Sequence, residues 1–199
     1  MELGHDTECA LATVVDLVNS GPKRSHSGAE ELADLAALQA LVLRREISEV
    51  GSLNREDLAT MLRLRERLHA VFTAPDERTA VRLVNALIAD ARTTPRLTDH
   101  EDWPMHIHYA AAGARLGERL AADCGMALAL LIAAGERQRL ATCAAPDCER
   151  ILVDLSRNRS KRYCESRTCG NRLHVAAYRA RQRTPASEGH RLDGRHGRH

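Results

Sequence analysis

The chain has 199 residues, of which 44% are hydrophobic and 28% are charged, and its formal net charge at pH 7 is +2. This length leaves room for one ordinary domain and a small appendage, and the apolar content is sufficient for a packed core. The longest nearly unbroken apolar stretch, residues 124–134, is shorter than the roughly 20 residues that cross a bilayer. The N-terminus carries acidic residues where a secretory signal would be basic and apolar. We therefore expect a folded cytoplasmic protein with no membrane partner.

Two amphipathic helices are predicted in the first 50 residues. Apolar side chains recur at helical spacing over residues 7–19, and the sequence NSGP then ends this first helix. Ser27 and Glu30 match a capping box, in which the hydroxyl and the carboxylate each satisfy a free backbone N–H. The second helix is therefore expected to begin at this box and to end near Ile47.

Two further helices are predicted before residue 95. Asn54 has the character of an N-cap, with Leu53 and Leu58 as a hydrophobic staple across it. In the third helix that follows, the arginines of the sequence RLRER, residues 63–67, are expected on the solvent-facing side. The fourth helix is expected from about residue 76 to residue 92.

The segment 95–110 breaks the helical pattern. Its apolar residues alternate with His106 and His108, which is the period of a β-strand, and a short β-hairpin with solvent-facing imidazoles is predicted. These two histidines and Trp103 are the candidate lining of an effector pocket. An H-x-H pair can also chelate a metal, but the hairpin supplies no independent third ligand.

A long helix is predicted from about residue 114 to residue 140, leading directly into Cys143. The sequence contains no phosphate-binding loop, no nucleophile elbow and no dinucleotide-binding turn. A reactive constellation would have to come from the loose group of hairpin histidines. We therefore expect that the protein is not an enzyme.

Four of the six cysteines form two equal pairs in the last third of the chain. These cysteines are Cys143, Cys148, Cys164 and Cys169. Each pair encloses four residues, and 15 residues separate the pairs. In a reducing compartment such pairs more often bind a metal than form disulfides, and four thiolates suit one Zn²⁺ with no position left for a substrate. Four unrelated buried cysteines and an iron–sulfur cluster are weaker alternatives. Cys9 and Cys124 are expected to be small buried apolar side chains.

Positive charge is concentrated around the cysteine pairs. Residues 143–199 carry 13 Lys and Arg against 6 Asp and Glu, a balance of +7, whereas residues 1–142 carry 16 against 21, a balance of −5. After the last cysteine, Gly170 can turn the chain and Asn171 can cap a basic helix. A cationic loop and a cationic helix are thus expected on one zinc module. The candidate DNA-contacting side chains are Arg157, Arg159, Lys161, Arg162, Arg172, His174, Arg179, Arg181 and Arg183.

The tetrapeptide Cys169-Gly170-Asn171-Arg172, the preceding sequence DLSRNRSKRYC and the basic run that follows resemble the CGNR zinc-finger family. The helical region before the finger, with LVNS at residues 17–20, resembles the ABATE domain of that family. The resemblance implies a bacterial, stress-induced transcription regulator whose finger contacts DNA. His174 stands where a basic residue is typical, which removes one expected phosphate contact.

We expect a mostly α protein. A helical regulatory domain with a short β-hairpin should occupy residues 1–140, a Cys₄ zinc finger with a C-terminal basic helix residues 141–184, and a disordered tail residues 185–199. The expected function is zinc-dependent regulation of transcription through double-stranded DNA, with the first domain sensing a small-molecule effector or forming a homodimer. A zinc-stabilised protein-interaction adaptor is the alternative, and a small-molecule enzyme is a weaker one.

Overall fold

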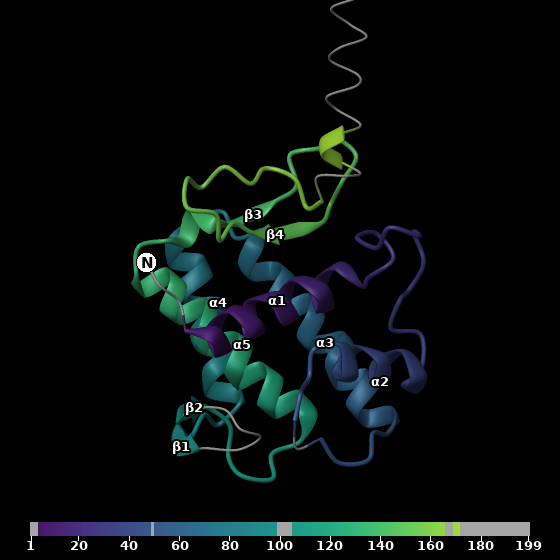
Figure 1. Ribbon diagram of the computed structural model, residues 1–199, viewed down its shortest axis with the longest axis vertical. Helices are drawn as coiled ribbons and strands as arrows, with labels where there is room; N and C mark the ends of the chain where they lie inside the picture. Colours follow the sequence, from purple (N-terminus) through teal and green to yellow (C-terminus); the bar gives the residue numbers. More distant parts are fainter. Residues whose placement is uncertain (1–3, 49, 99–104, 166–168, 172–199) are drawn as a thin grey trace, which may run out of the picture. The chain divides into compact units, whose positions relative to one another are not determined.

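The computed structural model describes residues 4–48, 50–98, 105–165 and 169–171 (Figure 1). The chain divides into two compact units, Met1–Cys164 and Glu165–His199. The elements of the described residues, all in the first unit, are α1 (His5–Asn19), α2 (Leu35–Arg44), α3 (Arg55–Phe72), α4 (Glu77–Asp90), β1 (Arg96–Thr98), β2 (His106–His108), α5 (Leu116–Ala133), a 3₁₀ turn (Arg137–Arg139), β3 (Leu140–Thr142) and β4 (Ile151–Val153). The predicted mostly α fold with a short hairpin is confirmed.

In the second unit the described residues are 165 and 169–171, where the Gly170 N–H donates to the Glu165 carbonyl at 3.2 Å. The predicted basic helix after Asn171 and the predicted tail over residues 185–199 lie outside the described residues. None of the helices within the described residues combines the length and the apolar character that crossing a bilayer requires.

Helix α5 lies at the centre of the helical region and packs against α1, α3 and α4 (Figure 1). Because it has neighbours on several sides, α5 is apolar over most of its surface, and Leu128 and Leu131 are completely buried. At Gly125 the chain passes close to α4, where an added Cβ would lie 3.1 Å from the Ile88 side chain. The strands that follow α5 pack on this helical core, β3 against α3 and β4 against α1.

The predicted start of α3 is confirmed. The Asn54 side chain accepts hydrogen bonds from the Glu56 and Asp57 N–H groups at 2.8 and 3.2 Å, and the Asp57 carboxylate accepts one from the Asn54 N–H at 3.0 Å. These reciprocal bonds satisfy donors that the helix itself leaves unpaired. The predicted first and fourth helices are also confirmed, with Asp76 capping the fourth.

The predicted capping box at Ser27 and Glu30 is wrong, because α2 begins at Leu35 with Asp34 as its N-cap. Glu30 instead forms a bidentate ion pair with Arg65 of α3, at 2.7 and 2.8 Å. The hydrogen bond from Arg65 holds the pKa of the Glu30 carboxyl below its usual value. Arg65 is only 7% exposed, so its predicted position on the solvent-facing side is also wrong. The pair holds the loop between α1 and α2 against α3.

Helix α5 ends at Ala133, earlier than the predicted end near residue 140. Gly135 adopts a left-handed conformation with φ of 72°, and its N–H donates to Ile132 while the Glu136 N–H donates to Leu131. This Schellman arrangement closes the helix, because glycine carries no Cβ to oppose the left-handed turn. The chain is thereby released into a 3₁₀ turn and an antiparallel β3–β4 hairpin that the sequence analysis does not predict.

The hairpin predicted within residues 95–110 is present as β1 and β2, with Leu97 opposite Ile107. The assignment of its faces is wrong. His106 and His108 are half-buried, whereas Leu97 and Ile107 are exposed together with Met105. The imidazoles face inward because His108 meets the buried Arg119 of α5, with its Nδ1 3.2 Å from a guanidinium nitrogen.

Candidate metal centre

The first cysteine pair is positioned by the β3–β4 hairpin. Cys143 follows β3 directly, and its N–H donates to the Arg150 carbonyl at 2.8 Å, which extends the pairing of the strands by one residue. Cys148 lies in the connection between the strands, where its N–H closes a turn on the Ala145 carbonyl at 3.1 Å. Hydrogen-bonded backbone thus fixes the approach of two sulfur atoms from one end of a hairpin.

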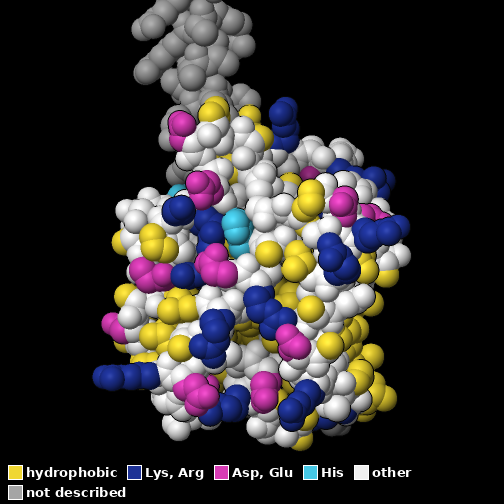
Figure 2. Space-filling view, turned by 180° about the vertical axis from the view of Figure 1, so that it is seen from behind, with side chains coloured by type: hydrophobic (Ala, Val, Ile, Leu, Met, Phe, Trp, Pro, Cys, Tyr) yellow, Lys and Arg dark blue, Asp and Glu magenta, His cyan; other side chains and the backbone are white. Residues whose placement is uncertain are grey.

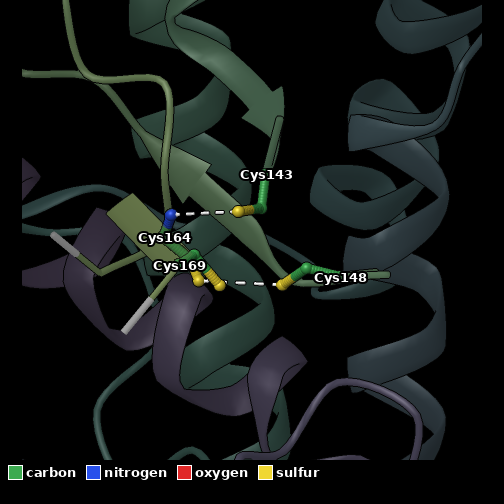
Figure 3. A group of neighbouring side chains, drawn as sticks. All are labelled: Cys143, Cys148, Cys164 and Cys169. Atoms are coloured by element: carbon green, nitrogen blue, oxygen red, sulfur yellow. Dashed lines mark hydrogen bonds between the residues drawn. The ribbon is translucent and has the colours of Figure 1, made fainter. Parts of the chain in front are cut away.

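The returning chain brings the second pair to the first. The Ala144 N–H donates to the Arg162 carbonyl at 2.9 Å, and the Cys164 N–H donates to the Cys143 Sγ at 3.4 Å. The Sγ atoms of Cys148 and Cys164 are 3.8 Å apart. With the buried Cys169 included, the four sulfur atoms lie within 4.8 Å of one another (Figure 3).

The four sulfur atoms fit one zinc ion. Tetrahedral ligands at a Zn–S distance of about 2.3 Å are separated by about 3.8 Å, which is the observed spacing of Cys148 and Cys164. Although burial raises the pKa of the Cys143 thiol, hydrogen bonds from the Ala145 and Cys164 N–H groups and from neighbouring thiols hold it below its usual value. Thiolate is the form that binds zinc. The predicted cofactor, a single structural Zn²⁺, is confirmed.

Strand β4 anchors this centre in the helical core. Ile151, Leu152 and Val153 are all buried, and Ile151 is 0% exposed. At the end of α1, the Asn19 side chain donates to the Ile151 carbonyl at 3.0 Å and accepts from the Ile151 N–H at 2.9 Å. The Asn19 amide thereby makes the two hydrogen bonds to Ile151 that the backbone of a neighbouring strand would otherwise make. Asn19 is a positioning residue that the sequence indicated only as the end of the first helix and as part of the NSGP and LVNS sequences.

A buried ionic cluster shapes the loop that follows β4. The Arg139 guanidinium donates to the Glu136 carboxylate at 2.9 Å and to the Asp154 and Ser156 carbonyls at 2.7 and 2.9 Å. The Asp154 carboxylate in turn accepts from the N–H groups of Ser156 and Lys161 at 2.9 and 2.8 Å. The backbone of residues 154–161 is therefore held by fixed acceptors and donors.

The loop presents cationic side chains beside the cysteines. Arg157, Lys161 and Arg162 are exposed. Arg159 is 52% exposed at its side chain, and its guanidinium donates to Glu136 at 2.7 Å. Although burial alone would raise the pKa of the Glu136 carboxyl, hydrogen bonds from the two arginines hold it below its usual value. The remaining predicted DNA contacts lie outside the described residues: Arg172, His174, Arg179, Arg181 and Arg183.

The other candidate site is the effector pocket predicted at Trp103, His106 and His108. His106 and His108 are in contact, with 3.0 Å between their Nε2 atoms, and His108 lines a cavity of about 140 Å³. Trp103 lies outside the described residues, and His106 does not line this cavity. Within the part of the chain that the structure describes, the four cysteines are the one cluster of three or more metal-ligating side chains.

The two isolated cysteines have different surroundings. Cys124 is completely buried in α5, and burial raises the pKa of its thiol, so it is a small apolar core residue as predicted. Cys9 is exposed on α1, with its Sγ 3.4 Å from the His5 Nε2, so the prediction that it is buried is wrong.

Comparison with known proteins gives two family matches, one over the helical region and one over the cysteine pairs. A search of curated proteins gives no match. A family described as "CGNR zinc finger" matches residues 139–182, and a family described as "Putative stress-induced transcription regulator", ABATE, matches residues 11–145, more than half of the chain. The two matches overlap where β3 leads into Cys143. The chain therefore belongs to the ABATE family, with a CGNR zinc finger following its helical region.

Proposed function

We propose that this protein is a zinc-dependent regulator of transcription that binds duplex DNA through its finger. The observation that carries this proposal is the loop over residues 156–162, which presents Arg157, Lys161 and Arg162 from a backbone fixed by Asp154. Because this backbone is already ordered, phosphate binding by its cationic side chains costs little backbone entropy. Membership in a family described as transcription regulators supports the same conclusion.

The surface of the helical region offers no comparable cationic patch on the face that Figure 2 shows. Basic and acidic side chains are interspersed there, so their fields largely cancel at the distance of a nucleic acid. The loop beside the cysteines is thus the better candidate for phosphate contacts. On the part of the finger outside the described residues, we propose Arg172, His174 and Arg179 as base readers and Arg181 and Arg183 as further phosphate contacts.

Binding of duplex DNA is expected to depend steeply on salt. If about four to six phosphates are neutralised, the logarithm of the association constant falls with the logarithm of salt concentration at a slope of about −4 to −5. Replacing Arg157 by alanine should lessen this slope by about one unit. The slope is measured by fluorescence anisotropy of a labelled duplex at salt concentrations between about 50 and 200 mM. Arg78→Ala, at an exposed position of α4, is the matched control and should leave the slope unchanged.

Sequence preference separates the two kinds of contact. Arg157→Ala should weaken binding to all duplexes alike, whereas Arg179→Ala should change which duplexes are selected from a random pool. Undetectable duplex binding at low salt in the zinc-loaded protein, or an affinity that ignores salt, would contradict the DNA assignment. Either result would favour the protein-interaction adaptor.

We further propose that the helical region senses a small molecule. The cavity lined by His108, between α1, α5 and β2, supports this role. The alternative role, self-association as a homodimer, would use the exposed apolar side chains of the hairpin, Leu97, Met105 and Ile107.

A further inference from the structure

The cavity beside β2 has a volume of about 140 Å³ and combines apolar walls with charged groups. The buried side chains of Leu120 and Ala127 contribute hydrocarbon surface. The charged side chains that line it are the carboxylates of Asp6, Glu46 and Asp123 and the guanidinium groups of Arg45 and Arg119. A dry cavity of about 150 Å³ is known to accept benzene, so this volume suits a ligand of about seven non-hydrogen atoms.

Both guanidinium groups of the cavity have acceptors within the protein. Arg119 donates to the Ser48 carbonyl and lies 3.2 Å from the His108 Nδ1. Arg45 pairs with Asp16, which is not part of the lining, at 2.6 Å. The charge of Arg45 is therefore balanced by a carboxylate outside the lining, whereas these hydrogen bonds of Arg119 go to neutral groups and leave its charge in place. Among the charged side chains that line the cavity, the carboxylates outnumber the guanidinium groups by three to two. An anionic ligand would have to compete with these acceptors.

Asp123 has the opposite character. Among the described residues, no cation lies within salt-bridge distance of its carboxylate. Burial raises the pKa of this carboxyl to about 6, against the lowering effects of the Arg119 charge and the Tyr109 N–H. The negative charge of Asp6 adds to the rise. Asp123 is consequently a desolvated carboxylate that is mostly ionised at neutral pH and gains from a cationic partner.

We propose that this cavity binds a small organic cation, with the protonated amine of the ligand against Asp123 and its hydrocarbon body against Leu120 and Ala127. The ammonium replaces hydration that the half-buried carboxylate has lost, and the apolar walls remove hydrocarbon from water. The ligand class itself does not depend on the sensing role proposed above. Only its consequence for regulation rests on that role.

A route from the cavity to the finger exists along α1. Asp6, near the start of this helix, lines the cavity, and Asn19, its last residue, holds Ile151 of β4. A ligand that stabilises the first turns of α1 thus acts on the helix that fixes the zinc-bearing hairpin.

Three probes with one ring and different head groups test the ligand class. The full-length zinc-loaded chain would be titrated with cyclohexylamine, cyclohexanol and cyclohexanecarboxylate at pH 7.5, with backbone amide shifts measured by NMR. The amine is expected to bind at least about tenfold more tightly than the alcohol and to shift amides of α1, β2 and α5, because it alone supplies a charge for Asp123. Tighter binding of the carboxylate, or equal binding of amine and alcohol, would overturn the proposal.

Asp123→Asn should bring the affinity for the amine down to that for the alcohol while leaving the alcohol unchanged. Asp90→Asn, at an exposed position of α4, is the control and should preserve the preference for the amine. An undiminished preference in Asp123→Asn would also overturn the proposal. Should this variant fail to fold, the ranking of the three probes on the unmodified chain still decides the ligand class.

The affinity for the amine is expected to fall about tenfold between pH 7.5 and pH 5, because Asp123 must be ionised to pair with the ligand and becomes protonated as the pH falls through about 6. The other titratable or charged groups facing the cavity are Asp6, Cys9, Arg45, Glu46, His108, Tyr109, Arg119 and Cys124. In Asp123→Asn, the affinity for the amine should fall over this pH range only by the amount that these other groups contribute. A decline of equal size in that variant would contradict the role of Asp123.

The DNA assay separates this inference from the proposed function. Duplex affinity would be measured with and without saturating amine. A change in duplex affinity supports both the ligand class and the sensing role. Amine binding with unchanged duplex affinity supports the ligand class and contradicts the sensing role. Duplex binding without any amine binding contradicts the ligand class and leaves the DNA assignment standing.

Discussion

Replacing Cys164 by serine is expected to remove the zinc ion and to release the chain that follows Lys161, while the helices keep their structure. Cys164 joins both halves of the centre, since its N–H donates to Cys143 and its sulfur lies 3.8 Å from that of Cys148. Structural zinc contributes on the order of 10 kcal/mol to modules of this size, so the loss of one ligand should abolish stable binding. Elemental analysis should find about one zinc per chain in the unmodified protein and almost none in the variant.

Hydrogen exchange gives this prediction a finer test. The amides of Ala144 and Cys164 should lose protection in Cys164→Ser, because their acceptors are Arg162 and Cys143 of the metal centre. Those of Ser156 and Lys161, which donate to Asp154, and those of Ile151 and Val153, which the helical core buries, should keep it. Cys9→Ser is the matched control, since Cys9 is exposed and takes no part in the cluster. Its zinc content should be unchanged. A zinc-free unmodified protein, or helices that melt together with the loop, would contradict this account.

Replacing Asn19 by alanine is expected to lower the free energy of unfolding by about 2 to 5 kcal/mol. The variant loses both hydrogen bonds to Ile151 and leaves a backbone N–H and a carbonyl without partners, each at a cost of about 1 to 3 kcal/mol when buried. Because Asn19 is itself 3% exposed, water has little access to replace the amide. Urea unfolding followed by circular dichroism measures the change.

Asn85→Ala provides the control for this measurement, because Asn85 is exposed on α4 and its replacement should change stability by less than about 0.5 kcal/mol. Asn19→Asp adds a second comparison. It keeps the acceptor for the Ile151 N–H but places an oxygen against the Ile151 carbonyl, so it should destabilise at least as much as alanine. Equal stability of Asn19→Ala and Asn85→Ala would contradict the stabilising role of the Asn19 hydrogen bonds to Ile151.

Features that depend on neighbouring residues in the sequence were predicted well. Asn54 and the three residues after it contain all the groups of the α3 capping box. The equal spacing of the cysteine pairs likewise carries the zinc prediction, because two short loops each present two sulfur atoms to one ion. In both cases the chemistry is complete within a short segment.

Features that depend on distant partners were not predicted. Glu30 has the spacing of a capping residue, but a bidentate pair with the buried Arg65 outweighs a local bond at an exposed helix end. Strands β3 and β4 have three residues each, too few for their alternation to be recognised. Gly135 was the one local signal that the long helix ends before the cysteines.

The burial of β4 bears on how such proteins exchange parts during evolution. A gene fragment that encoded only the segment from Cys143 onward would carry all four metal ligands but neither β3 nor Asn19. In a new host, Ile151 and Val153 would be left as exposed apolar residues unless the recipient offered a matching groove and an amide in the right place. Recombination should therefore preserve the helical region and the finger as one heritable unit, and shuffling at the boundary between them should be selected against.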